Sequence, residues 1–206
     1  MQTDKTIYHY LQDVSAKTPV APSAGSVLAL CAASSAALTE FVANTTIGKK
    51  GYEDAGQEMK EISQTAQEYR QLLLTCMEED TEAMNGVFSA FKLPKDTPEA
   101  KMLRDKEIQK AYQKSVLSPL KLLKETYNLM ELIYYVMKEG NINAFGDAVT
   151  AANLAEAVII SSVYNMKINL ESIKDDGFKE GVLQQLEELE DKTLVLEEQI
   201  MLLINN

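Results

Sequence analysis

Two aspartates stand at positions where a carboxyl group can do acid–base chemistry. Asp80 interrupts an apolar stripe at a position where leucine would be expected, and Asp147 lies in the first turn of an expected helix. A buried carboxyl group is costly unless it is hydrogen-bonded or has a shifted pKa, and a raised pKa suits it to donate and accept protons near neutral pH. Each aspartate also has a structural reading. Asp80 can turn out to solvent on a long helix, and Asp147 can complement the helix dipole.

Small and basic residues flank one expected helix at its two ends. Ser23, Gly25 and Ser26 open it, and the unpaired N–H groups of a helix N-terminus suit an anion. The alternative is that Ser23 or Ser26 is only an N-cap. Lys49 and Lys50 follow the far end of the same helix, where cations are favourable in any case.

Further amide and lysine side chains can hold the polar parts of a ligand. They are Asn85, Lys92, Asn143, Asn165, Lys167 and Asn169. Asn165 and Asn169 are four residues apart and share a helix face. Asp147 precedes Asn165 by 18 residues, about 27 Å of helix, so both cannot touch one small reacting group unless a site is shared between subunits.

Long helices must position these side chains. Apolar residues recur at three- and four-residue spacing, which predicts helices at roughly 3–14, 25–46, 53–92, 97–139, 143–172 and 176–204. The second and fifth are rich in alanine and serine, which is typical of helices that pack closely on several sides. We therefore expect one all-α domain over residues 1–206, a single-domain bundle of long helices that forms a homodimer.

Composition excludes several classes of function. The chain of 206 residues has 20 Lys and Arg against 31 Asp and Glu, a net charge of −11, which disfavours nucleic acids and anionic membrane surfaces as partners. No run of 18 uninterrupted apolar residues and no leader pattern is evident, so we expect a soluble cytoplasmic protein without a membrane span. One histidine and two separated cysteines argue against a metal site or a catalytic triad.

Six short blocks occur in an order that resembles a known family. They are Pro22-Ser23-Ala24-Gly25-Ser26, Asn44-Thr45-Thr46-Ile47-Gly48-Lys49-Lys50, Asp80-Thr81-Glu82-Ala83, Lys92-Leu93-Pro94, Gly140-Asn141-Ile142-Asn143-Ala144 through Asp147, and Asn165-Met166-Lys167-Ile168-Asn169-Leu170. Together they resemble the formimidoyltetrahydrofolate cyclodeaminase and methenyltetrahydrofolate cyclohydrolase family over nearly the whole chain. The family usually has a Gly-Gly-Gly-Ser turn where this chain has Ser23-Ala24-Gly25-Ser26, and often a serine at Gly146.

The resemblance implies an all-helical dimer that handles a folate one-carbon unit. In the implied reaction, the anilino nitrogen of 5-formimidoyltetrahydrofolate attacks the formimidoyl carbon, and the adduct expels ammonia to leave 5,10-methenyltetrahydrofolate. Asp147 and Asp80 are then the candidate acid and base, in an order that the sequence leaves open. The lysines and asparagines named above would bind the glutamate tail and the pterin, and no metal or other cofactor is expected.

Two other functions remain open at this point. One is methenyltetrahydrofolate cyclohydrolase, in which water attacks the methenyl carbon and the ring opens. The other is a non-catalytic helical dimer that binds folate or a partner protein, in which the altered glycine turn has ended catalysis.

Overall fold

Four long helices enclose the core of the protein. The computed structural model describes residues 1–18 and 21–205, in which the four helices are α2 (Ala24–Thr46), α3 (Gly56–Phe91), α4 (Pro98–Glu139) and α5 (Phe145–Leu170). Both α3 and α5 pack against α2 and against α4, so the four form a closed ring. The described residues include no strand, and the expected all-α bundle is confirmed.

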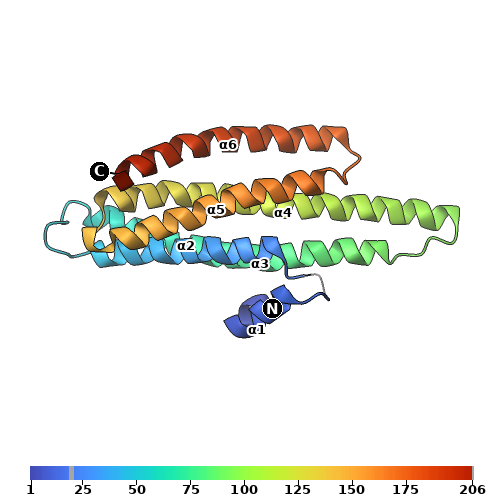
Figure 1. Ribbon diagram of the computed structural model, residues 1–206, viewed down its shortest axis with the longest axis horizontal. Coiled ribbons are helices and arrows are strands. Elements are labelled where there is room, and N and C mark those ends of the chain that lie inside the picture. The colour runs from blue at the N-terminus through green and yellow to red at the C-terminus, as the bar shows by residue number, and fades with distance from the viewer. Residues whose placement is uncertain (19–20, 206) are drawn as a thin grey trace.

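The remaining elements lie outside this ring (Figure 1). Helix α6 (Asp176–Asn205) runs along α4 and α5 on one side of the bundle. Helix α1 (Ile7–Ser15) lies apart from α6, near the start of α2. Short 3-10 turns η1 (Gln2–Asp4) and η2 (Ile142–Ala144) precede α1 and α5. The hairpin of α3 and α4 extends beyond the other helices, which leaves its tip exposed.

Local capping chemistry fixes the helix boundaries, and it corrects the first expected helix. Helix α4 begins at Pro98, because the Thr97 hydroxyl accepts a hydrogen bond from the Ala100 N–H at 3.1 Å. A continuous helix over 3–14 was wrong. The chain is extended at Thr6, whose hydroxyl accepts from the backbone N–H of His9 at 3.3 Å, so α1 starts only at Ile7.

Small side chains let α2 approach both of its neighbours closely. Ala29, Ala32 and Ala36 are fully buried, and alanine at such positions allows the neighbouring helices to come near. The Ser35 hydroxyl donates to the Ala151 carbonyl at 2.7 Å, which fixes how α2 aligns with α5. Because the loop before α5 is also bonded to the end of α2, the two helices are antiparallel.

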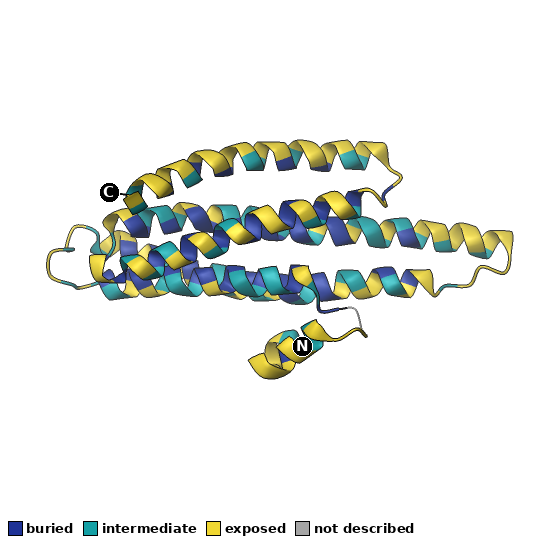
Figure 2. Ribbon diagram, viewed as in Figure 1, coloured by how far each residue is buried: buried dark blue, intermediate teal, exposed yellow. Residues whose placement is uncertain are grey.

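Two helices are long and apolar enough to cross a membrane by length and composition. They are Ala24–Thr46, with mean hydropathy 1.6, and Ile142–Leu170, with mean hydropathy 1.2. Both supply core residues to the bundle, with 50% and 39% of those windows buried. They nevertheless leave apolar side chains exposed, and Figure 2 shows exposed turns along α5. We define the α2–α5 face as Phe41, Ile160, Tyr164 and Ile168, which are 47%, 47%, 68% and 65% exposed.

Candidate active site at the start of helix α2

Asp80 is buried against the first turn of α2. Its side chain comes from the middle of α3, and the residue is only 7% exposed, so the apolar stripe on α3 does carry this carboxyl group inward. The backbone N–H of Ser26 donates a hydrogen bond to the carboxyl group. The carboxyl oxygen Oδ2 is also buried, and it has no hydrogen-bond partner among the described residues. Such an orphaned oxygen is rare in protein interiors and calls for a ligand or a proton.

Gly25 makes room for this carboxyl group. A Cβ at Gly25 would lie 2.0 Å from Asp80 Oδ1 and 2.4 Å from its Cγ, which no real side chain tolerates. The neighbouring departures from the glycine turn are compatible with the backbone: Ser23 is extended at φ −139°, ψ −156°, and Ala24 is exposed. Ser23 is the N-cap residue but makes no side-chain cap hydrogen bond. Within this turn, Gly25 is therefore the glycine that the Asp80 contact requires.

Burial changes the acidity of Asp80. Removal from water raises the pKa of its carboxyl group from the ordinary 3.8 to about 6, against the opposing effect of the Ser26 N–H. A carboxyl group with this pKa exists in both protonation states near neutral pH, so it can donate and accept a proton within one reaction cycle. The combination of burial, an unpaired oxygen and a raised pKa marks this turn as the strongest candidate for chemistry.

Tyr10 belongs to the same cluster and was missed from the sequence. It is 2% exposed, and its hydroxyl lies 3.0 Å from the Ser26 hydroxyl, which is itself fully buried. Burial raises the pKa of the Tyr10 phenol, and the nearby Asp80 carboxyl group acts in the same direction. Nothing in the sequence distinguishes Tyr10 from Tyr8, which is 68% exposed on the same helix.

A second missed residue, Ser162, lies at the same level of the bundle. The bond between Ser35 and Ala151 sets the alignment of α2 and α5. Gly25 precedes Ser35 by ten residues on α2, and Ser162 follows Ala151 by eleven residues on α5. Because the helices are antiparallel, both lie about 15 Å from that bond in the same direction. The Ser162 hydroxyl is buried and, among the described residues, has no hydrogen-bond partner. A periodic apolar pattern cannot reveal this, because serine at a core position usually bonds its own helix backbone.

The other end of α2 holds a different, more solvated cluster. Asn141, missed from the sequence as a site residue, ties the loop before α5 to α2: its backbone N–H donates to the Thr46 hydroxyl at 2.8 Å, and its side-chain amide donates to the Thr45 carbonyl at 3.2 Å. The Lys49 ammonium donates to Asn141 Oδ1 and lies 5.6 Å from the Tyr52 ring centroid.

The remaining residues at that end are open to solvent. Lys50 and Asn143 are exposed, and the Asn143 backbone N–H donates to Asn141 Oδ1 at 3.0 Å. A hollow of about 480 Å³, lined by Tyr52, Ile142 and Phe145 among others, adjoins this cluster. This end of α2 therefore offers cationic and amide groups around an open space.

Asp147 is not near Asp80 within one chain. It is half-buried in the first turn of α5, four residues before Ala151, and so lies level with Thr39 on α2. The fourteen residues of α2 between that level and Gly25 correspond to about 21 Å. One chain thus separates the two carboxyl groups by far more than the width of a one-carbon unit.

Asn165, Lys167 and Asn169 lie toward the Asp80 end, because α5 runs antiparallel to α2. Asn165 is half-buried. The Asn169 amide donates to the Ser115 carbonyl at 3.2 Å, and the exposed Lys167 pairs with Glu190 at 3.4 Å. These existing partners give Asn169 and Lys167 structural roles in holding α5 to α4 and α6.

Asn85 and Lys92 are exposed on the projecting part of α3. Asn85 follows Asp80 by five residues, which puts it on a different side of the helix. Lys92 is the C-cap residue of α3, twelve residues beyond Asp80 and about 18 Å along the axis. The structure does not bring these two side chains to the Asp80 cluster.

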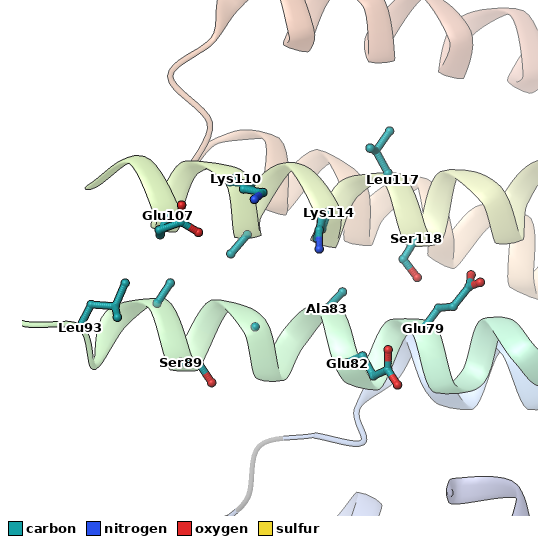
Figure 3. Close-up of a pocket in the computed structure, with 13 residues that line it drawn as sticks. Glu79, Glu82, Ala83, Ser89, Leu93, Glu107, Lys110, Lys114, Leu117 and Ser118 are labelled. Carbon is teal, nitrogen blue, oxygen red and sulfur yellow. The ribbon is translucent and has the colours of Figure 1, made fainter. Parts of the chain in front are cut away.

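A groove of about 600 Å³ lies between α3 and α4 in the projecting hairpin (Figure 3). Figure 3 shows Ala83 and Leu93 of α3 pointing toward α4, and Lys114 of α4 pointing toward α3, whereas Ser89 points away. None of the site residues predicted from the sequence lines this groove. Its edge includes Glu79, the neighbour of Asp80, but Glu79 turns to Lys121 with Oε1 2.9 Å from Nζ.

Comparisons with known proteins agree with the resemblance found in the sequence. Residues 6–188 match the family model described as formiminotransferase-cyclodeaminase. A methenyltetrahydrofolate cyclohydrolase from Methylorubrum extorquens is 32% identical over 97% of this chain and 96% of its own. A formimidoyltransferase-cyclodeaminase from Sus scrofa is 30% identical over 90% of this chain, which spans only 34% of that longer protein.

The fold has a close counterpart among solved structures. The crystal structure of a formiminotetrahydrofolate cyclodeaminase from Thermotoga maritima matches with a TM-score of 0.89 and 28% identity, over 100% of this chain and 98% of the other. The match extends through every helix described above. On the family model, the relatives and the fold together, the chain belongs to the formiminotransferase-cyclodeaminase family.

Proposed function

We propose that this protein converts 5-formimidoyltetrahydrofolate to 5,10-methenyltetrahydrofolate with release of ammonia. The observation that carries the proposal is the buried Asp80 carboxyl group, with an unpaired Oδ2 and a pKa raised by burial to about 6, at the first turn of α2. The relatives that act on folate one-carbon units support the substrate class.

The proton balance of this reaction suits a single carboxyl group. The bond from the anilino nitrogen to the formimidoyl carbon forms as that nitrogen loses its proton, and the bond from the carbon to the amino group breaks as ammonia leaves with one more proton. Asp80 accepts the first proton as a carboxylate and returns it to the leaving amine as an acid. When the formimidoyl group starts as its amidinium cation and ammonia leaves in the neutral form, no proton is gained or lost overall, and the proposal needs no resident metal or nucleotide.

The positive end of α2 contributes to the same step. The Ser26 backbone N–H in the first turn bonds to the Asp80 carboxyl group, and it stabilises the anionic form while the group holds no proton. Burial favours the protonated form. The two influences oppose each other, and the effect of burial is the larger, so the pKa of Asp80 lies above its ordinary value.

The second candidate is the cyclohydrolase reaction. The 32% identity to a methenyltetrahydrofolate cyclohydrolase, across nearly the full length of both chains, favours it specifically. In that reaction water attacks the methenyl carbon. Asp80 would remove one proton from the water and return it to the departing nitrogen, and the second proton of the water would leave to solvent as the carbonyl forms. The same carboxyl group would serve both reactions.

A cytoplasmic homodimer is part of the proposal. Ile160, Tyr164 and Ile168 of the α2–α5 face recur every four residues on α5 and are exposed, and burial of these apolar side chains against a second copy is favourable. A two-fold axis perpendicular to the long axis of the bundle would bring opposite ends of the two copies together. Asp147 and Lys49 of the second copy can then approach the Asp80 end of the first, which would supply a cation for the folate glutamate and a second carboxyl group.

The experiment is an absorbance time course in the methenyl band. Wild-type enzyme and Asp80→Asn, purified in parallel, are added to formimidoyltetrahydrofolate and then to methenyltetrahydrofolate, each against a blank. An enzyme-dependent rise with the first substrate that Asp80→Asn lacks supports the cyclodeaminase. An accelerated fall with the second substrate alone would replace it by the cyclohydrolase, and flat traces with both would leave a non-catalytic folate-binding or structural protein.

A further inference from the structure

Helix α1 has one buried side chain, and its partly buried Val14 also packs against the core. Tyr10 is the single buried residue of this helix. The large apolar side chains on either side of it, Ile7, Tyr8 and Leu11, are 74%, 68% and 53% exposed. The helix therefore contributes one aromatic ring to the interior, and that ring enters next to the first turn of α2.

The buried Tyr10 side chain is connected to the Asp80 carboxyl group through Ser26. The Tyr10 hydroxyl bonds to the Ser26 hydroxyl at 3.0 Å, and the Ser26 backbone N–H bonds to the Asp80 carboxyl group. One serine thus links the tyrosine and the aspartate through its side chain and its backbone. Gly25, which has no side chain, leaves the space in which the carboxyl group lies.

Few charged or titratable groups face this cluster. Besides Asp80, the Tyr10 phenol has Cys31 of α2 and Glu78 of α3 near it. Glu78 is itself held by Thr3, whose backbone N–H donates to Oε1 at 2.9 Å. No cation among the described residues contributes to the pKa shift of Asp80. Exclusion of water is therefore what this part of the molecule can use to control the carboxyl group.

We propose that Tyr10 is a positioning residue of the candidate site, and that its ring shields the Asp80 carboxyl group from water. The inference rests on the proposed function for the catalytic role of Asp80. The shielding itself is a property of the folded chain alone. Loss of the ring lets water reach the carboxylate and stabilises its charged form, so the proton affinity of Asp80 falls.

The test is a titration of the Asp80 carboxyl carbon by NMR in full-length protein with ¹³C-labelled aspartate, assigned with Asp80→Asn. Tyr10→Ala removes the ring, Tyr10→Phe keeps the ring and removes the hydroxyl, and Tyr8→Ala is the matched control on the exposed side of the same helix. Tyr10→Leu is a second ring-free variant with an apolar anchor. Circular dichroism checks that each variant keeps the bundle.

We expect Tyr10→Ala to lower the pKa of Asp80 by about one unit or more, and Tyr10→Leu to lower it in the same direction by less. Tyr10→Phe and Tyr8→Ala should leave it within about 0.3 unit of wild type. An unchanged pKa in both ring-free variants overturns the proposal. A fall in Tyr10→Phe as large as in Tyr10→Ala overturns the role given to the ring, because the hydroxyl would then control the carboxyl group.

Activity gives an independent readout. The limb of the pH–rate profile that reports Asp80 should shift to lower pH in Tyr10→Ala by the same amount as the NMR titration, and return to the wild-type position in Tyr10→Phe. A shift in the NMR titration without any folate turnover in wild type would support the shielding while refuting the proposed function. A profile that stays in place while the NMR pKa moves would exclude Asp80 as the group that limits turnover.

Discussion

The two ends of helix α2 differ in how they treat charge. At its start, the Asp80 carboxyl group is buried against the Ser26 backbone N–H and Gly25, and the Tyr10 hydroxyl bonds to the Ser26 side chain. At its end, Lys49 is bonded to an asparagine side chain and lies beside Tyr52, next to an open hollow. The first environment changes proton affinity, and the second supplies charge that solvent can reach.

The two environments suit different parts of the proposed folate reaction. Proton transfer needs a group whose pKa is shifted by burial, whereas an anionic substrate tail needs a solvent-accessible cation. Thr46 follows Gly25 by 21 positions along α2, which holds these environments about 32 Å apart. The predictions below test whether the buried end alone does the chemistry and whether a second copy brings the two ends together.

The largest effect is expected from Asp80→Asn. Turnover should fall by about 10²-fold to 10⁴-fold, because the amide can neither accept nor return the proton that the reaction moves. Steady-state kinetics in the methenyl band measures this, with circular dichroism as the check on folding. A loss below about tenfold would remove Asp80 from the chemistry and leave the solvated end of α2 as the better candidate.

The same substitution has an opposite effect on stability. Burial raises the pKa of Asp80 above its ordinary 3.8 to about 6, so the folded protein keeps its proton while the unfolded chain has already lost it. The unfolding free energy therefore falls as pH rises from about 4 to about 6, by up to about 3 kcal/mol, and is then level. Asp80→Asn lacks this loss. Urea unfolding at pH 4 and pH 7 should show that the unfolding free energy of Asp80→Asn, relative to wild type, is higher at pH 7 than at pH 4. The same difference at both pH values would contradict the raised pKa.

Gly25→Ala should be next in size. The new Cβ meets Asp80 Oδ1 at 2.0 Å, so the carboxyl group must move, at a cost of about 1 to 3 kcal/mol of stability and most of the activity. Gly86→Ala is the matched control, because no other atom lies within 4 Å of a Cβ there. In an Asp80→Ala background the cost of Gly25→Ala should shrink, since the atoms it strikes are gone. An equal cost in both backgrounds would mean that the glycine serves the backbone and not the carboxyl group.

The sequence predicts the helices better than it predicts the residues of the site. The apolar spacing and the breakers predict five of the helices to within a few residues, and Thr6 shows why the first was wrong, since a local hydroxyl cap overrides an apolar pattern. Asp80 could be found because it breaks a stripe. Tyr10 and Ser162 could not, because a tyrosine on a short helix and a serine in a small-residue helix look ordinary until the tertiary contacts are known.

It was harder to predict which of the site residues lie together in space. Six blocks in one chain imply one site, yet the structure places Ser23, Gly25 and Ser26 with Asp80, and puts Lys49, Lys50 and Asn143 at the far end of α2. Spacing along a sequence gives the distance along one helix but not which ends of antiparallel helices meet. Contacts between copies are invisible to both the periodic pattern and the single chain.

Asp147→Asn tests whether a second copy brings Asp147 to the Asp80 end of α2. We expect the fold to remain intact and turnover to fall at least tenfold, about 1.4 kcal/mol of barrier. Because Asp147 is about 20 Å from the Asp80 level in its own chain, an effect of this size requires the second copy to supply it. Unchanged turnover would remove Asp147 from the mechanism and leave Asp80 to move the proton alone.

Mixing two inactive variants separates these outcomes. When Asp80→Asn and Asp147→Asn chains are refolded together, half of the dimers combine the two, and each such dimer has one site with both aspartates intact. A shared site therefore predicts recovery of about a quarter of wild-type activity. Mixtures that stay as slow as the separate variants would show that both aspartates act within one chain, or that the chains do not pair.

The smallest effect is expected from Ser162→Ala, which tests whether the second unpaired oxygen at the buried end of α2 has a function. The Ser162 hydroxyl has no partner among the described residues, so its removal should change the unfolding free energy by less than about 0.5 kcal/mol or raise it. Ser35→Ala on the facing helix is the control, because it breaks the 2.7 Å bond to Ala151 and should cost about 1 kcal/mol. If the unpaired hydroxyl serves the substrate, Ser162→Ala raises KM several-fold with stability intact. If KM is unchanged, the buried end of α2 has one orphaned oxygen that matters, that of Asp80, and the serine is a packing residue.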